Sequence, residues 1–520
     1  MERNIAPIFQ SLAAAQAANS SLTFTLSGTA MWGLVPSFYR YFYEREILRW
    51  LRWYDGFVPE IHGVAKGIIS TNIAKTIVDR SMDAVFTGGV MFGNADKPKM
   101  VDENGVSLSL CAISDRWAKE VDFESHLRQV CKYAASGGTG LLKLNQGARG
   151  RLWLDTYRAD RFFAVLDTSG HVESVKAVLT IYQGGGEQST AFAIVEERYY
   201  RDLKWSRRVP VQRFSVYRVP TSTTQVTLSQ QVMWKNLPHP MKDYLRKEYA
   251  SIRIDEEQIL PFASLGCYAF RYTDGCDRYN GVEMGDSMIQ PIMQYLLGYD
   301  YYFSAMMTDM YLGRGRVIAK KAMKSPGADR GGNHYNEGLD GFLFEQIPTL
   351  SVEEQKPTPI QFDLRSADWR EIRNIFMESI AFTIGMSVGT LASFLGDASN
   401  RTAREISAEE NATARFVEAR RHQFEKPANE CLRDVCKYYG FADIVSVRWS
   451  LAGQTNIDTL SQRMVTEVQA GVRSLQSAVQ SINPDMDDHQ VQEEIARIDK
   501  DQGKKNAALF GDIGGATEII

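Results

Sequence analysis

Few residue patterns in this sequence could support catalysis, and the most suggestive is incomplete. Gly137-Gly-Thr-Gly140 could begin a phosphate-binding loop, in which backbone N–H groups surround a nucleotide phosphate. It lacks the Gly-Lys-Ser/Thr end that brings a lysine to the phosphates, and no complete loop of this kind occurs anywhere in the chain. We therefore expect these glycines to form a turn between a helix and a strand.

Histidine and cysteine are arranged no more suggestively. The seven histidines are scattered, with no His-Glu-x-x-His and no Gly-x-Ser-x-Gly motif. The six cysteines (111, 131, 267, 276, 431 and 436) have no Cys-x-x-Cys spacing. Cys431 and Cys436 share one predicted helix at a spacing that suits a disulfide poorly, so we expect reduced thiols. The sequence predicts no catalytic residue, no metal site and no cofactor.

A long helix is predicted from about 402 to 439. Thr402 followed by Glu405 forms a capping box, in which each side chain satisfies a free backbone N–H at the helix start. Pro427 predicts a kink near residues 423–427, and Gly440 ends the helix. One apolar face runs along its second half: Phe424, Ala428, Cys431, Leu432 and Val435.

Two further helices are separated by a glycine-rich insertion. Residues 285–313 contain no Lys or Arg and carry an apolar stripe along a helix over 288–312: Ile292, Leu296, Tyr299, Phe303, Met306 and Met310. The insertion, from about 315 to 362, predicts short strands at Arg316–Lys320 and Phe342–Glu345. The second helix is expected over 367–384.

The remaining chain predicts a mixture of helices and strands. Helices are expected over 37–55 and 70–86, one strand over 444–451, and further helices over 461–481 and 489–501. Between 140 and 275 the pattern changes to strands, over 141–144, 174–182, 191–200, 209–219 and 230–235. The fold class predicted from these elements is α+β.

Composition bounds the functional classes. A chain of 520 residues with 44% hydrophobic content can bury a large core in several subdomains. Its net charge of −4 argues against a dedicated nucleic-acid binder. Polar residues interrupt every apolar run in the uncharged stretch 4–39, which predicts an ordered arm and neither a membrane span nor a signal peptide.

Residues 368–405 resemble the portal proteins of tailed bacteriophages, of a siphophage-like kind. The family carries an Ile-Ala-x-x-x-Gly-hydrophobic-Pro/Ser-x-x-x-Leu segment, a variable loop and a Thr-Ala-Thr-Glu-like helix start. Here these are Ile380-Ala-Phe-Thr-Ile-Gly-Met-Ser-Val-Gly-Thr-Leu391 and Thr402-Ala-Arg-Glu405, in which Arg404 departs from the pattern. The segment from Gly471, with Asn483-Pro-Asp485, is similar to the helical crown end of many portals.

The resemblance implies a portal fold with a mixed α/β wing, a two-helix stem, a small α/β clip, a long kinked tunnel helix and a helical crown. The implied divisions are arm and wing (1–284), first stem helix (285–314), clip (315–362), second stem helix (363–385), tunnel loop (386–401), tunnel helix with a wing strand (402–455), and crown with a flexible tail (456–520).

It also implies a function and a set of partners. Portal proteins form a ring, twelve-fold in the particle, at one capsid vertex of the virion, after assembly in the host cytoplasm. Double-stranded DNA passes through the ring without sequence-specific recognition. The implied partners are other copies of the chain, the terminase large subunit, a head–tail connector protein, and the major capsid and scaffolding proteins, with no membrane. An enzyme such as a nuclease or ATPase, and another structural head protein without a DNA channel, are the alternatives.

Site residues follow from the resemblance. The channel constriction would be the tunnel loop with Gly389, Phe394, Leu395, Gly396, Ser399 and Asn400, and the tunnel-helix cap would be Thr402 and Glu405. The stem wall of the channel would carry Gln294, Asp300, Tyr301, Thr308 and Asp309. A lysine introduced at Asp300 would be repeated in every subunit and would slow DNA, if that side chain faces the channel.

Overall fold

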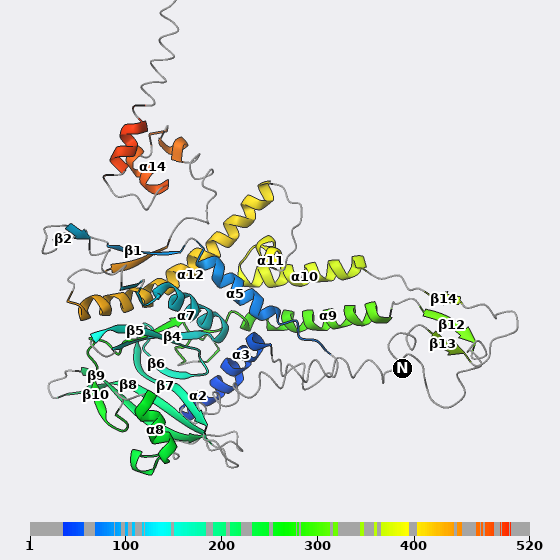
Figure 1. Cartoon of the computed structure of the whole chain (residues 1–520). Coiled ribbons are helices and arrows are strands. Elements are labelled where there is room, and N and C mark those ends of the chain that lie inside the picture. The colour runs from blue at the N-terminus through cyan, green and yellow to red at the C-terminus, as the bar shows by residue number, and fades with distance from the viewer. Residues whose placement is uncertain are drawn as a thin grey trace, which may run out of the picture.

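A computed structural model gives the fold, which is α+β as predicted (Figure 1). It describes residues 35–56, 68–87, 89–94, 99–101, 107–109, 117–118, 120–146, 150–183, 191–203, 208–219, 231–248, 253–276, 278–279, 282–312, 316–320, 344–347, 358–360, 366–394, 403–440, 445–449, 464–468, 470–471, 474–482, 489, 491–498 and 500. Residues 4–34 of the arm predicted over 4–39, and the predicted tail from 502, lie outside this part of the chain.

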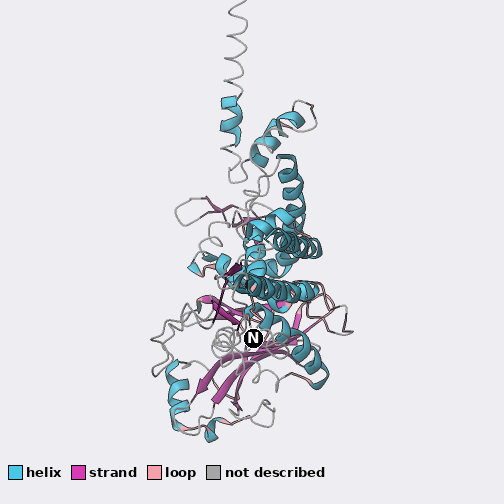
Figure 2. Ribbon diagram, turned by 90° about the vertical axis from the view of Figure 1, so that its right-hand side faces the viewer, coloured by secondary structure: helices cyan, strands magenta, loops and turns pink. Residues whose placement is uncertain are grey.

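The body is built on two antiparallel sheets. The first has the order β11-β4-β5, with bounds Cys267–Arg271, Thr139–Gln146 and Leu152–Tyr157. The second has the order β10-β9-β8-β7-β6, with bounds Glu257–Ile259, Arg208–Val219, Ala191–Asp202, Val172–Gln183 and Phe162–Leu166. Figure 2 shows the long strands at one end of the body and most helices above them. Four of the five strands predicted in this region are confirmed.

The strand predicted over 230–235 is wrong. Only Gln231 bridges the sheet, opposite Tyr217, and the chain then forms the short 3-10 helix η4 (Trp234–Asn236) and the helix α8 (His239–Glu248). The physical reason is burial of a second sheet face. Leu237, Met241 and Leu245 pack with Phe192, Ile194 and Val216 in a separate small core.

Helices near the start of the chain pack against one another, and the last of them, α7, packs on the first sheet. Residues 37–55 are helical, as α2 (Ser37–Phe42), a π-helical turn (Tyr43–Ile47) and α3 (Leu48–Asp55). The others are α5 (Ile73–Val85) and α7 (Phe123–Gly137). The turn predicted at Gly137–Gly140 joins α7 to β4, and Gly138 has a positive φ of 83°. A Cβ on Gly138 would lie 2.1 Å from the carbonyl oxygen of Gly285, so these glycines serve close packing.

Two long helices run side by side away from the body (Figure 1). They are α9 (Met293–Leu312), which follows the 3-10 turn Gln290–Ile292, and α10 (Ser366–Ile384). The small sheet β13-β12-β14 lies beyond them, with bounds Phe344–Ile347, Arg316–Lys320 and Thr358–Ile360. The strand predicted over 342–345 is found slightly later in the chain. We call α9 and α10 the helix pair.

Aromatic rings hold the helix pair together. The Tyr302 ring lies 5.4 Å from that of Trp369, and the Tyr299 ring lies 6.3 Å from that of Phe376. Gly298 allows the close approach, because a Cβ there would lie 2.7 Å from Cε1 of Phe376. At the base of the pair, Nε1 of Trp50 donates to Oε1 of Gln290 at 2.6 Å.

The predicted long helix is α12 (Ala403–Tyr438), which contains Pro427. Gly440, two residues beyond its end, has a positive φ of 77°. Figure 1 shows that α12 changes direction along its length, between its yellow and orange parts. The short helix α11 (Val388–Phe394) precedes it, and β15 (Val445–Trp449) follows and pairs antiparallel with β1 (Val90–Asn94). A further pair joins β2 (Lys99–Val101) to β3 (Ser107–Ser109).

One of the two predicted C-terminal helices is interrupted. Residues 464–468 are helical, a turn follows at Ala470–Gly471, and α14 spans Leu475–Ile482. The single helix predicted over 461–481 is therefore wrong, because Gly471 takes a positive φ of 70° that breaks it. Residues 489, 491–498 and 500, all that the structure describes of the predicted range 489–501, are helical.

Candidate functional site

The open side of α9 is the first candidate surface. Gln294, Tyr301 and Thr308 are seven residues apart, so they lie on one side of the helix. Gln294 is exposed, Tyr301 is 42% exposed, and the half-buried Thr308 hydroxyl donates to the Ser304 carbonyl oxygen at 2.9 Å. The structure therefore brings together three of the five predicted stem residues on one uncharged face, which we call the α9 face.

Asp300 does not belong to this face, and its predicted place on a channel wall is wrong. It is only 2% exposed, and its Oδ1 accepts hydrogen bonds from the Thr71 N–H at 2.9 Å and the Thr71 hydroxyl at 2.6 Å. The reason is tertiary packing: the segment before α5 lies along this side of α9, where the Ile69 N–H also donates to Ser304 Oγ. Burial raises the pKa of Asp300, although the bonds from Thr71 and Ser70 oppose the rise. Asp309 is half-buried.

Part of the segment predicted as the tunnel loop is helical. Gly389 is buried within α11, and Phe394 is the last residue of that helix, so the loop prediction fails over 388–394. Ser387 is the cause, because its Oγ accepts the Thr390 N–H at 3.0 Å and caps the helix. The other predicted loop residues lie outside the described chain: Leu395, Gly396, Ser399 and Asn400.

The predicted capping box is only partly covered by the described residues. Thr402 lies outside them, and Glu405 is in the first turn of α12 with its side chain undescribed. Three hydroxyl groups connect the start of α11 to α12. Ser387 Oγ donates to Thr390 Oγ1 at 2.8 Å, and Thr390 Oγ1 lies 2.8 Å from Thr413 Oγ1 on α12. These three hydroxyls pin α11 to α12.

The open side of α10 is a second surface that sequence reasoning missed. Phe382 is 89% exposed, Ile375 is 55% exposed and Ile372 is 37% exposed. The three lie within one stripe along the helix, at spacings of three and seven residues. The spacing was available in the sequence, but Trp369, Phe376 and Ile380 form a second apolar stripe that masks it. We call Ile372, Ile375 and Phe382 the α10 face.

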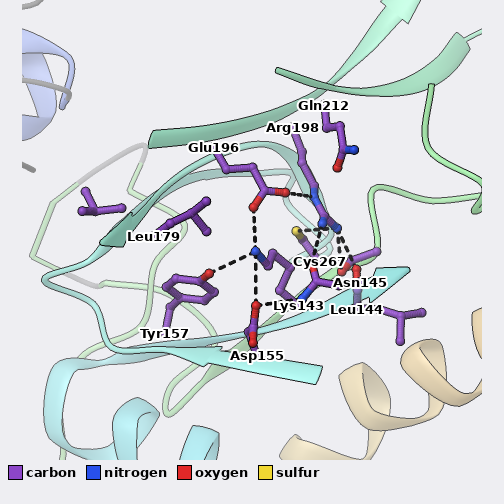
Figure 3. Close-up of polar contacts among 12 residues, drawn as sticks. Lys143, Leu144, Asn145, Asp155, Tyr157, Leu179, Glu196, Arg198, Gln212 and Cys267 are labelled. Atoms are coloured by element: carbon purple, nitrogen blue, oxygen red, sulfur yellow. Dashed lines mark hydrogen bonds and ion pairs between the residues drawn. The ribbon is translucent and has the colours of Figure 1, made fainter. Parts of the chain in front are cut away.

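A buried charge cluster lies between the two sheets of the body (Figure 3). It consists of Lys143 on β4 with Glu196 and Arg198 on β8. Lys143 Nζ lies 2.6 Å from Glu196 Oε2, and Arg198 Nε donates to Glu196 Oε1 at 2.6 Å. Arg198 also donates to the carbonyl oxygens of Leu144 and Leu265 at 2.9 and 3.0 Å.

The cluster is buried, and Asp155 Oδ2, which lies 3.4 Å from Lys143 Nζ, supplies the second carboxylate that balances its two cations. Each of its three residues is at most 3% exposed. Burial alone would raise the pKa of Glu196, but Arg198 and Lys143 outweigh burial and lower that pKa to about 2. The pKa of Lys143 rises, because Glu196 and Tyr157 outweigh the effect of burial. A cluster whose polar groups pair with one another and lie away from solvent serves to join the sheets.

Other possible sites in the described residues carry little chemistry. A half-open cavity of about 720 Å³ lies between α12, β11 and the β6–β7 turn, and its walls mix cations and carboxylates, among them Arg271, Lys426, Asp274 and Glu430. No group of three or more His, Cys, Asp or Glu residues in this part of the chain could hold a metal ion. The five cysteines described, at 131, 267, 276, 431 and 436, are buried free thiols, as predicted for Cys431 and Cys436. No described helix is long and apolar enough to cross a membrane.

Comparisons with known proteins give matches among solved structures and none by family model or curated sequence. The chain matches no protein-family model and no curated protein sequence. Among solved structures it is similar to a chain described as "Neck of native GTA particle computed with C12 symmetry". The match has a TM-score of 0.39 and 12% identity, and covers 82% of this chain and 93% of that chain. A likeness of this size supports no argument about function.

Proposed function

We propose that this chain is a phage portal protein, whose copies form a ring around a channel for double-stranded DNA. The observation that carries the proposal is the helix pair: α9 leads from the body to the small sheet, α10 returns, and α11 and α12 follow. This order of elements matches the stem, clip and tunnel helix that the resemblance at residues 368–405 implies. The uncharged α9 face supports the same proposal.

The chemistry of the α9 face suits a conduit. Duplex DNA carries about one negative charge per 1.7 Å of its axis, so a wall of Lys or Arg would hold it and resist sliding. The helix α9 contains no Lys and no Arg, and Gln294 and Tyr301 offer neutral polar groups to solvent. In a ring these groups would recur in every subunit, which would give a channel section that does not retain phosphate.

The proposal includes the chain's partners and its place. We propose a homo-oligomeric ring of twelve subunits at the capsid vertex of a virion, assembled in the host cytoplasm. Terminase large subunit, a head–tail connector protein, and the major capsid and scaffolding proteins would bind its outer surfaces. We further propose that the chain is not an enzyme and that ATP hydrolysis belongs to the motor that docks on it.

Negative-stain images of the purified full-length chain test the channel. The expected result is a ring with a central opening, with a mass that corresponds to many copies by light scattering. A monodisperse monomer, or a closed particle with no opening, would contradict the proposal. The same preparation should hydrolyse no ATP in the presence of Mg²⁺. Turnover that follows the protein through purification would contradict the non-enzymatic part.

A further inference from the structure

The turn between β6 and β7 is tied to α12 on both sides of the proline in that helix. Pro427 has no N–H to complete the helical hydrogen bonds, so α12 is weakened at this point. Just before the proline, Lys426 Nζ donates to the Ser169 carbonyl oxygen at 2.7 Å. Less than one helical turn after it, Glu430 Oε1 lies 3.0 Å from Nε2 of His171. These two contacts therefore span the weak point of the helix.

The His171 ring lies between two carboxylates. Its Nδ1 is 3.2 Å from Asp167 Oδ2, and its Nε2 faces Glu430. An imidazolium carries an N–H on each ring nitrogen and can donate to both carboxylates, whereas a neutral imidazole carries one N–H. In the neutral form, one ring nitrogen would turn a lone pair toward a carboxylate oxygen, which is repulsive. Holding both acids at once therefore requires the second proton.

The turn itself is fixed by contacts that do not involve the imidazole. The His171 backbone N–H donates to Asp167 Oδ1 at 2.8 Å. Gly170 has a positive φ of 84°, and a Cβ there would lie 2.5 Å from Nη2 of Arg271. Burial would raise the pKa of Asp167, but the backbone N–H and the side chain of His171 outweigh burial and lower that pKa. Asp167 therefore stays ionised, and the turn keeps its shape, while His171 changes charge.

The other side chains around His171 do not change charge in the same pH range. Beyond Asp167, Lys426 and Glu430, the charged and titratable groups that line the cavity of about 230 Å³ beside His171 are Tyr200, Cys267, Tyr268, Arg433, Asp434 and Lys437. Burial raises the pKa of both tyrosines and of the thiol, so these groups stay neutral. Within this set, histidine is the type of side chain whose charge ordinarily changes between about pH 5 and pH 8.

We infer that His171 is a pH-dependent brace across the proline of α12, which holds the β6–β7 turn on Glu430 when both ring nitrogens are protonated. A neutral His171 can donate to Asp167 or to Glu430 but not to both, so the link to Glu430 weakens as the pH rises. The second half of α12 then opens more readily from Pro427 onward. Protonation switches of this kind act by biasing one element between two arrangements. The inference concerns a single chain and does not rest on the proposed function.

Hydrogen exchange of the full-length chain at about pH 5.5 and about pH 8 tests the brace. Labelling times are scaled for the faster chemical exchange at the higher pH. Amides of residues 424–436 should open about two- to fivefold more often at the higher pH, as expected for the loss of one partly exposed ionic contact. In a His171→Gln variant this pH dependence should disappear, because the glutamine amide does not change charge.

The matched control is His422→Gln. His422 is also an exposed histidine and lies on α12 about one turn before Lys426, so this variant should keep the pH dependence of the wild type. Equal opening of residues 424–436 at both pH values in the wild type would overturn the inference. A pH dependence that survives His171→Gln, or one that vanishes in His422→Gln, would also overturn it, because each result assigns the effect to another group.

Discussion

The body and the helix pair differ in which side chains lie in an unfavourable environment: the body buries charged side chains, and the helix pair exposes apolar ones. In the body, the cations Lys143 and Arg198 are buried and paired within one chain, with Glu196 between them and Asp155 3.4 Å from Lys143. In the helix pair, Ile375 and Phe382 stay in water, although α10 buries Ile380 and Ala381 on its other side. The body is complete as a single chain. In the helix pair, one side of α10 is covered by the same chain and the other side is exposed.

The difference shows where single-chain and multi-chain requirements lie in this molecule. A buried ion must be paired at the moment of folding, because an unpaired one costs several kcal/mol. An exposed apolar stripe does not prevent the single chain from folding, because the free-energy cost of hydrating it is divided among several side chains. A partner that covers the stripe would remove that cost. Mutations in the two regions should therefore act on different observables: unfolding free energy for the body, and local order or assembly for the helix pair.

The largest effect on stability is expected from Glu196→Gln in the body. The change leaves Arg198 buried without a negative partner and leaves Lys143 with Asp155 alone, at 3.4 Å, and breaking a buried pair in this way costs about 3–5 kcal/mol. Urea unfolding of the two proteins measures the loss. The matched control is Glu197→Gln on the opposite face of β8, because Glu197 pairs with Lys176 at 3.2 Å where both side chains are about one third exposed. We expect a cost of no more than about 1 kcal/mol there.

The wild type and Glu196→Gln should also differ in how their stability depends on pH. The pKa of Glu196 is lowered to about 2 in the fold, so its stabilising effect is fully present above the carboxyl pKa of the unfolded chain. That effect is lost as the pH falls toward 2. The difference in unfolding free energy between wild type and Glu196→Gln should therefore narrow as the solution is acidified from about pH 5. A constant difference would refute the paired cluster.

An intermediate effect is expected from Gly298→Val in the helix pair. A side chain there meets the Phe376 ring, since even a Cβ would lie 2.7 Å from Cε1. Forcing the ring aside should cost about 1–3 kcal/mol. Hydrogen exchange should show faster exchange in α9 and α10 and unchanged protection in β7–β9. Ala305→Val on the exposed side of α9 is the control, with an expected change of about 0.5 kcal/mol or less.

A smaller effect of opposite pH dependence is expected from Asp300→Asn at the base of the helix pair. Burial raises the pKa of Asp300, so the native chain holds this proton more tightly than the unfolded chain does. Ionised Asp300 therefore lowers stability as the pH rises through the raised pKa. Asparagine can still accept the Thr71 bonds, so the variant should gain on the wild type by up to about 1 kcal/mol between acidic and neutral pH. A gain that instead grows on acidification would contradict the assignment.

The smallest effect on folding is expected from Tyr301→Lys on the α9 face. This variant should nevertheless lower the rate of DNA packaging. Tyr301 is exposed, so unfolding free energy should change by about 0.5 kcal/mol or less. In the proposed ring every subunit would add one positive charge to the channel wall, which should slow packaging at low salt and less so at high salt. Tyr301→Gln is the neutral control. Packaging at the wild-type rate at low salt would place this face outside the channel.

The sequence predicted elements well where local signals agreed. The long helix was expected over 402–439 and found as Ala403–Tyr438, because Gly440 marks its end and polar residues start it. The loop prediction over 386–401 failed in part, since Ser387 caps a further helix. A capping serine before a glycine-containing stretch is a weak signal, and packing of α11 on α12 decided the outcome.

Predictions about individual side chains depended on contacts distant in the chain. The helical period placed Gln294, Tyr301 and Thr308 on one side of α9, and the structure agrees. It could not show that Thr71, far earlier in the sequence, covers Asp300. The charge cluster was equally hidden. Glu196 and Arg198 are two residues apart and so share one face of β8, but their partners come from β4 and the segment before β11.

The hydrogen bonds between Asp300 and Thr71 also have a mechanical meaning. The small sheet at the end of the helix pair is tied to the body by two helices, and α9 alone rises by about 30 Å. A pull on that sheet would travel along both helices as tension. On α9 part of this tension would act on the hydrogen bonds between Asp300 and Thr71, which connect α9 to the segment before α5. In a single-molecule pulling experiment, α9 of the wild type should therefore detach from the body at a higher force than α9 of a Thr71→Ala variant.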